Sequence, residues 1–382
     1  MGLLLLVSLA CSAPREPVSL SLLTALSGSD AAALQEHLNA IAATVEPVTV
    51  RLHTVPLRAL EDTVLAFNPH TAGGRWDLAV VPTSWIHRLH QRQAILEVPN
   101  HHVLSLQQTV MPLALLATSV QGQVMGYPLS ANVEALVLNP HLFPHVPTSL
   151  AALTRTPLPP GVLPLGVNLR DPAQVLPLLA SWETLPPDAT PPALAQLLRR
   201  FLLALQPATA QRDLFNLWMT STAPAVQAQL FAEGRLAALV SGPQVLGLLE
   251  TLQKPLVVTP LPAVCEGCSP PKPWARVTAV VVSNVCPYPD LAQQLALELT
   301  TLERNVQLNL AMNLLPVAGG ADESQILAKS PALFGFQRAL ASARVLKAAE
   351  LSETWNAWEK ALALVMQEPQ QERAGSGQRG EL

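Results

Sequence analysis

Residues 231–243 read Phe-Ala-Glu-Gly-Arg-Leu-Ala-Ala-Leu-Val-Ser-Gly-Pro. A helix-like stretch ends in this segment at Phe231, and an apolar run, Ala237–Val240, follows before Gly242-Pro243 turns the chain. Short apolar runs bounded by Gly and Pro are typical of buried strands. We therefore expect a strand over Ala237–Val240.

Strands and helices alternate along the N-terminal part of the chain. The alternating segment Pro17–Ala25 predicts a strand, and Asp30, a residue type that caps helix N-termini, precedes an Ala-rich helix. The same order repeats with a strand over Val48–Val55 and a helix over Leu57–Phe67, and Asp77–Val81 is a third strand. This alternation predicts a doubly wound α/β domain.

The rest of the chain continues the α/β pattern. Further strands are expected over Val133–Leu138, Leu256–Thr259 and Arg276–Ser283. Further helices are expected over Pro192–Leu205, Gln211–Phe231 with a break at Pro224, Asp290–Ala311 and Pro331–Gln367. Residues 368–382 form a polar tail that has no apolar surface to bury, and we expect it to be disordered.

Composition excludes several classes of protein. Hydrophobic residues make up 49% of the 382 residues, which excludes a disordered chain. No apolar stretch approaches the roughly 20 residues that a membrane-spanning helix needs. The net charge of −4 and the scattered basic residues give no field that would attract nucleic acid. The charged fraction of 13% is about half of the ~25% of an ordinary soluble domain, which we ascribe to a compositional bias of the source.

Motifs of catalysis and cofactor binding are missing. The sequence has no phosphate-binding Gly-rich loop, no nucleophile elbow and no zinc-protease pattern, and no nucleophile, base and oxyanion set converges by spacing. His87 and His90 can share a helix face, but we expect a solvated pair and no metal site. We therefore expect a protein that is not an enzyme and needs no cofactor.

Four segments, in order, resemble the extracellular solute-binding proteins of ABC importers, in particular the maltose-binding-protein-like carbohydrate binders. Each segment is weak evidence alone, but the four occur in the family's order and spacing. They are residues 73–81, residues 122–150, the F-x-x-G-x-x-A-x-x-x-x-G-P pattern of residues 231–243, and residues 280–292 with 315–317. The resemblance extends from about Val18 to Gln367.

The resemblance implies a type II periplasmic binding protein fold, in which two α/β lobes are joined by hinge crossings and close around a ligand cleft. The N-terminal lobe would comprise residues 12–132 and 279–316, and the C-terminal lobe residues 133–278 and 317–367. Ligands of open α/β sheets bind beyond the carboxyl ends of the strands, and clefts form where domains meet. A ligand that contacts both lobes would favour the closed state.

The resemblance also implies ligand-binding residues. Glu134 matches a ligand-contacting Glu of the family, and a carboxylate inside an apolar strand must find partners; its alternative is a structural ion pair at the hinge. Asp171 matches a second acidic contact, with a helix N-cap as its alternative. Trp355 matches a stacking Trp, although either Trp355 or Trp358 belongs to the core. The further candidates are Trp85, Ser29, Asp30 and Gln244.

The chain departs from the maltose binders in its aromatic residues. Gln244 and Ala173-Gln174 stand where the family often has aromatic side chains, and aromatic residues make up only 4% of the sequence. An oligosaccharide binder stacks successive sugar rings on aromatic faces, so we do not expect maltose as the ligand.

The N-terminus resembles a bacterial lipoprotein signal. Residues 3–10 are apolar, and the chain becomes polar soon after Cys11. No basic residue precedes the apolar run, and the alternative is a buried first strand. We expect residues 1–11 to be a signal ending at Cys11, whose lipidation would anchor the protein in the periplasm or on the outer face of the cytoplasmic membrane.

The sequence does not decide how the three further cysteines pair. Cys265 and Cys268 lack a second pair at zinc spacing, and no thioredoxin-like context surrounds them. An exported protein would form one disulfide, either within this pair or from it to Cys286. Free thiols are the alternative.

Taken with the resemblance, these features predict the substrate-binding component of an ABC transporter. We expect a monomer that captures a carbohydrate or another polar solute and delivers it to the transmembrane subunits of a permease. One alternative is a type II binding protein for a polyamine, an anion or a metal. Another is a surface lipoprotein that has kept the fold without transport.

Overall fold

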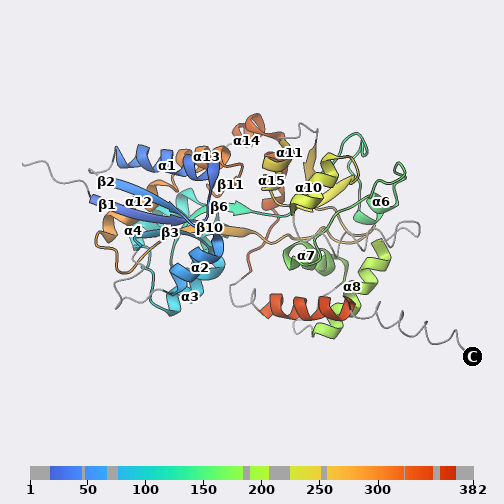
Figure 1. Cartoon of the computed structure of the whole chain (residues 1–382), viewed down its shortest axis with the longest axis horizontal. Helices are drawn as coiled ribbons and strands as arrows, with labels where there is room; N and C mark the ends of the chain where they lie inside the picture. Colours follow the sequence, from blue (N-terminus) through green and yellow to red (C-terminus); the bar gives the residue numbers. More distant parts are fainter. Residues whose placement is uncertain are drawn as a thin grey trace, which may run out of the picture.

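A computed structural model of the protein describes residues 18–44, 48–66, 76–183, 190–205, 224–250, 256–321, 323–346 and 353–366. These residues form two α/β lobes that lie side by side along the long axis of the molecule (Figure 1). The α/β class expected from the sequence is confirmed. Cys11 and the C-terminal tail lie outside the described residues.

A six-stranded sheet forms the first lobe. Its strands, in spatial order, are β11 (Leu315–Pro316), β6 (Tyr127–Asn132), β10 (Arg276–Val282), β3 (Leu78–Pro82), β1 (Val18–Thr24) and β2 (Val48–Thr54). β1 is parallel to β2 and β3, as the alternation of strands and helices predicts. β10 is antiparallel to both of its neighbours, because it enters the sheet from the second lobe.

Both faces of this sheet are buried. Leu78 and Val80 of β3 belong to one apolar cluster, whereas Ala79 and Val81 belong to another, as the two-residue period of a strand requires. Figure 1 shows α1 and α13 on one side of the sheet and α2 and α3 on the other. The helices of this lobe are α1 (Gly28–Ala42), α2 (Leu57–Leu65), α3 (Ile86–Gln91), α4 (Asn100–Thr109), α5 (Pro112–Ala117), α12 (Pro289–Glu298) and α13 (Leu302–Ala311), with a 3₁₀ turn, η1, at Thr83–Trp85.

The expected long helix over Asp290–Ala311 is wrong: two helices, α12 and α13, occupy this segment. Thr300 and Thr301 separate them, and their hydroxyls donate to the carbonyls of Leu297 and Glu298, at 2.7 and 2.9 Å. Threonine hydroxyls that bond to the backbone in this way compete with helical hydrogen bonding. The apolar spacing continues through the break, so it predicted one helix.

A three-stranded sheet forms the second lobe. Its central strand, β7 (Ala135–Leu138), is antiparallel to both β8 (Ala238–Ser241) and β9 (Val257–Thr259). The expected strand over Ala237–Val240 is therefore confirmed within one residue. The helices of this lobe are α6 (Leu150–Arg155), α7 (Pro172–Trp182), α8 (Pro191–Leu205), α10 (Pro224–Ala232), α11 (Val245–Glu250), α14 (Glu323–Lys329), α15 (Pro331–Leu340) and residues 353–366. A two-stranded hairpin, β4 (Ser119–Val120) and β5 (Gln123–Val124), forms a separate small sheet.

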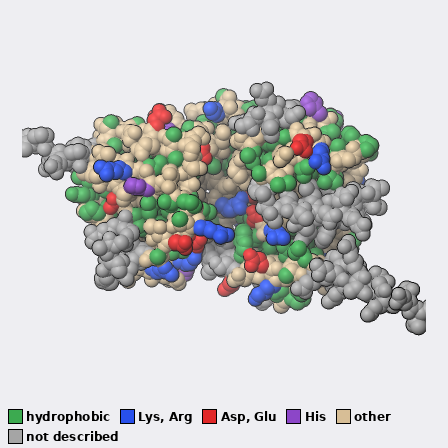
Figure 2. All heavy atoms as spheres, viewed as in Figure 1, with side chains coloured by type: hydrophobic (Ala, Val, Ile, Leu, Met, Phe, Trp, Pro, Cys, Tyr) green, Lys and Arg blue, Asp and Glu red, His purple; other side chains and the backbone are tan. Residues whose placement is uncertain are grey.

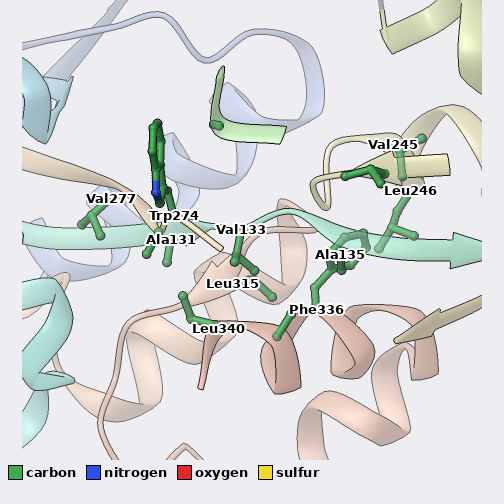
Figure 3. Packing of buried hydrophobic residues seen from close by; sticks show 14 of the residues in the cluster. Ala131, Val133, Ala135, Val245, Leu246, Trp274, Val277, Leu315, Phe336 and Leu340 are labelled. Atoms are coloured by element: carbon green, nitrogen blue, oxygen red, sulfur yellow. The ribbon is translucent and has the colours of Figure 1, made fainter. Parts of the chain in front are cut away.

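The helix α15 packs closely against the second sheet. A Cβ atom on Gly335 would lie 2.3 Å from the carbonyl oxygen of Val258 in β9, so only glycine allows this approach. Phe336 and Leu340 of α15 are fully buried and face the crossing strand near Val133 (Figure 3). The return segment after β11 thus brings the chain back onto the second lobe.

The chain crosses between the sheets at residues 133–134, which join β6 to β7. It returns from β9 to β10, and it crosses again after β11. Seen from the side of Figure 1, the surface is hollowed between the two lobes (Figure 2). The segments that join the lobes and the hollow between them define the region in which a shared site can form.

The structure resolves the cysteine pairing. Cys265 and Cys268 form a disulfide, and Cys286 is a free, buried thiol. Within the described part of the chain, no helix combines the length and the apolar character needed to cross a membrane.

Candidate functional site

Glu134 lies at the first crossing and is completely buried. Its carboxylate accepts a hydrogen bond from Nη2 of Arg276, the first residue of β10. The strand register explains this contact, because Arg276 pairs with Asn132, two residues before Glu134. A residue of the first sheet therefore forms an ion pair with a carboxylate in the segment that leads into the second sheet.

Asp171 adds a second carboxylate to the same guanidinium. Its Oδ1 accepts the backbone N–H of Ala173 at 2.9 Å, which caps the N-terminus of α7. Its Oδ2 accepts a hydrogen bond from Nη1 of Arg276 at 3.3 Å. The side chain therefore acts as the N-cap that the sequence allowed, while also contacting the arginine.

Gln174, in the first turn of α7, completes this group. Its Nε2 lies 3.4 Å from Oε2 of Glu134, and its Oε1 accepts the N–H of Asn168 at 2.8 Å. We refer to Glu134, Asp171, Gln174 and Arg276 as the crossing cluster. It joins β10 of the first lobe to α7 of the second lobe at the point where the chain crosses.

Burial changes the ionisation of the crossing cluster. It raises the pKa of Glu134 to about 7, although the charge of Arg276 acts to lower it. Burial also opposes the charge of Arg276, but the two carboxylates outweigh this effect and raise its pKa. The arginine is thus always charged, whereas Glu134 titrates near neutral pH.

Gln244 lies beside the crossing. It is exposed, and its Oε1 accepts a hydrogen bond from Nδ2 of Asn132 at 2.8 Å. A Cβ atom on Gly242 would lie 2.3 Å from Oδ1 of Asn132, so the Gly-Pro turn of the second lobe lies directly against the end of β6. Gln244 and Asn132 are two polar side chains, one from each lobe, next to the crossing cluster.

The two C-terminal tryptophans have different surroundings. Trp358 is fully buried, and its Nε1 donates to the carbonyl oxygen of Leu169 at 2.8 Å. It therefore belongs to the core and supports the loop that carries Asp171. Trp355 is half-buried on the same helix, so it is the tryptophan that keeps an accessible surface.

The other candidate residues lie in the first lobe. Trp85 ends the turn η1 and is buried in the apolar cluster that includes Ile86 and Leu89. Ser29 is exposed and Asp30 is half-buried in the first turn of α1, and burial raises the pKa of Asp30. Among the described residues, no hydrogen bond or ion pair joins any of these three side chains to the crossing cluster.

Sequence reasoning missed the residue that joins the cluster. Arg276 heads the strongly β-branched strand β10, and a charged residue at that position was the available signal. Its partner Glu134 lies 142 residues earlier, so only the tertiary register brings them together.

A cavity of about 410 Å³ lies apart from the crossing cluster. Residues before α5, after β11 and on α14 and α15 line it: Met111, Ala318, Gly320, Ala321, Glu323, Gln337, Arg338 and Ala341. None of the candidate residues belongs to this lining. Within the described ranges, no group of three or more His, Cys, Asp or Glu side chains is arranged to hold a metal ion.

Comparison with known proteins relates this arrangement to one family. The sequence model of the family of bacterial extracellular solute-binding proteins matches residues 38–335 of this chain. No curated protein sequence matches the chain.

Solved structures of similar fold cover almost the whole chain. A maltotriose-binding protein of Thermus thermophilus, bound with maltotriose, is 22% identical, with a TM-score of 0.72 over 91% of this chain and 94% of its own. A receptor of Streptomyces glaucescens, solved unliganded and with acarbose, is 15% identical, with a TM-score of 0.70 over 92% and 94%. The maltose-maltodextrin-binding protein of Alicyclobacillus acidocaldarius is 16% identical, with a TM-score of 0.69 over 91% and 99%. These matches confirm the two-lobed type II periplasmic binding protein fold.

Proposed function

Because the chain belongs to the bacterial extracellular solute-binding proteins, we propose that it is the substrate-binding component of an ABC importer for a carbohydrate or another polar solute. The observation that carries this proposal is the crossing cluster, in which Arg276 of one lobe meets Glu134 and Asp171 at the entry to the other. A solute bound there contacts both lobes. It therefore stabilises the closed arrangement more than the open one and shifts the population toward it.

A carbohydrate suits the chemistry of the residues near the crossing. Hydroxyl groups both donate and accept hydrogen bonds, and the guanidinium, carboxylates and amides here offer both kinds of partner. The relatives with solved structures include proteins bound with maltotriose and with acarbose. The low aromatic content, 4%, favours a short solute over a long oligosaccharide, because few rings are available for stacking.

Several residues are proposed to line the cleft between the lobes. Asp171 keeps some accessible surface, Gln244 is exposed beside the crossing, and Trp355 is half-buried. Ser29, Asp30 and Trp85 are proposed as first-lobe contributors, and Glu134 as a buried support that holds Arg276 beneath this lining. The sequence places the return crossing after residue 278, but β10 begins at Arg276. In this proposal the lobes therefore comprise residues 12–132 with 276–316 and residues 133–275 with 317–367.

Export and anchoring form the remaining part of the proposal. The family is extracellular, and lipidation of Cys11 would hold the protein on the outer face of the cytoplasmic membrane, next to a permease. Radiolabelled lipid that fails to attach to Cys11 in a bacterial host would contradict the anchor. The anchored protein is expected to act as a monomer.

A thermal-shift screen tests the function. A solute present at about 100 times its dissociation constant stabilises the folded protein by about 2.7 kcal/mol, which gives a measurable rise in Tm. We expect a rise with at least one sugar or polyol. A rise in Tm only with polyamines, oxyanions or metal ions would mean that the ligand belongs to one of these classes and is not a carbohydrate. No rise with any solute would favour a surface protein that has kept the fold without transport.

A further inference from the structure

The three charged side chains of the crossing cluster differ in their accessibility. The exposed fraction is 1% for Glu134, 19% for Asp171 and 39% for Arg276. Glu134 therefore has almost no surface that a molecule in the space between the lobes could contact. Arg276 is the charged side chain of the cluster that such a molecule would meet first.

Arg276 still has hydrogen-bond donors to offer. A guanidinium carries five N–H groups, and the recorded bonds use one on Nη2, to Glu134, and one on Nη1, to Asp171. None of its nitrogen atoms is among the buried polar atoms that lack a partner in the described part of the chain. Because 39% of the Arg276 side chain is exposed, its remaining N–H groups can donate hydrogen bonds to water or to a solute.

The charges of the cluster disfavour an acidic partner. One guanidinium faces two carboxylates, so the net charge is −1 when both are ionised and zero when Glu134 is protonated. Neither state attracts an anion. A hydroxyl group fits both states, because it can accept from Arg276 and donate to the partly exposed Asp171.

Resting on the proposed solute-binding function, we propose that Arg276, not Glu134, is the solute-contacting residue at the crossing, and that it selects uncharged polyhydroxylated compounds over acidic ones. Glu134 is a positioning residue. It holds one arm of the guanidinium fork while Asp171 holds the other, and the spare N–H groups keep a fixed direction.

This arrangement predicts a pH dependence of solute affinity. The charged groups that act on Glu134 are Arg276 at the start of β10 and Asp171 at the start of α7, whereas Gln174 of α7 is uncharged. Below about pH 7 Glu134 is protonated and loses its charge-assisted bond to Arg276, which then keeps only Asp171 as an ionic partner. Affinity for a neutral solute therefore falls as the pH is lowered.

Titration calorimetry with the neutral sugar or polyol that gives the largest thermal shift tests the proposal. We expect wild-type affinity to fall about tenfold between pH 8 and pH 6, the equivalent of about 1.4 kcal/mol. Glu134→Gln keeps a hydrogen-bond acceptor but does not titrate, so its affinity should not change over this range. The corresponding sugar acid, in which a carboxylate replaces a hydroxymethyl group, should bind the wild type at least about tenfold more weakly than the neutral compound.

Variants of the arginine provide the second part of the test. Arg276→Ala would leave a buried carboxylate unpaired and could prevent folding, so the double change Arg276→Gln with Glu134→Gln replaces the ion pair by two neutral amides. We expect this folded double variant to lose about 100-fold in affinity. Arg276→Lys keeps the charge without the fork and should lose about tenfold. Arg88→Gln, at an exposed arginine paired with Glu61, is the matched control and should not change affinity.

The outcomes separate this inference from the function on which it rests. A folded double variant with wild-type affinity, equal binding of the sugar acid, or identical pH profiles for the wild type and Glu134→Gln would each overturn the inference and leave the function intact. No thermal shift of the wild type with any sugar or polyol would overturn both.

Discussion

Replacing Glu134 by Gln should change how the stability of the protein depends on pH. Burial raises the pKa of this carboxyl from 4.5 to about 7, so between these values the folded state binds more protons than the unfolded state. Stability then falls as the pH rises, and the contribution of Glu134 is lost progressively from pH 4.5 to pH 7. The full difference corresponds to about 3 kcal/mol, at 1.36 kcal/mol for each pKa unit.

Urea unfolding between about pH 5 and pH 8, where most of this change falls, measures the effect. We expect the free energy of unfolding of the wild type to decrease relative to that of Glu134→Gln as the pH rises. Glu61→Gln, which removes an exposed carboxylate paired with Arg88 at 2.8 Å, controls for the loss of one negative charge. Parallel profiles, or a wild type that gains stability relative to the variant at higher pH, would refute the view that burial dominates over the pairing with Arg276.

Three further substitutions test the packing around the crossing, each by urea unfolding. Gly335→Ala should destabilise the protein by about 2 kcal/mol or more, because the new methyl group would overlap the backbone of Val258. The control Gly247→Ala lies in α11 with open space around it, so it should be neutral or stabilising by up to about 1 kcal/mol. Equal effects of the two changes would contradict the close packing of α15. Trp358→Phe removes the hydrogen bond to the carbonyl of Leu169 near Asp171, so it should lower the free energy of unfolding by about 2 kcal/mol or more and weaken solute binding. A variant with unchanged stability and affinity would show that this tryptophan does not support the loop. Asn305→Ala should lower the free energy of unfolding by about 3 kcal/mol, because the carbonyl of Leu129 loses a donor and the N–H groups of Val317 and Ala318 lose their acceptor. A loss below about 1 kcal/mol would mean that water replaces the amide.

The local elements were predictable because their signals are local. The strands β1 and β2 begin and end within about two residues of the expected positions, since alternation and flanking turn residues define them. The helix over Asp290–Ala311 was not predictable as two helices, because its end depends on two threonine hydroxyls rather than on apolar spacing.

The site was predictable only in part. A carboxylate within an apolar run identified Glu134 as a residue that needs partners, but its partner Arg276 depends on the register of β6 and β10. The sequence also could not distinguish Trp355 from Trp358, because residues three apart share a helix face. Tertiary packing decides that Trp358 is buried.

The dual role of Asp171 illustrates the same limit. Its position before Pro172 predicts an N-cap, and the backbone bond to Ala173 confirms this. The contact of its second oxygen with Arg276 has no signal in the local sequence, because the two residues lie 105 positions apart.

A crystal structure of the protein with the solute found by the thermal-shift screen would show directly whether the solute binds at the crossing cluster. We expect the solute to lie between the lobes, to contact both of them, and to accept a hydrogen bond from Arg276 within about 3.2 Å. A solute that binds one lobe alone, or that occupies the cavity lined by Met111 and Arg338, would contradict this expectation.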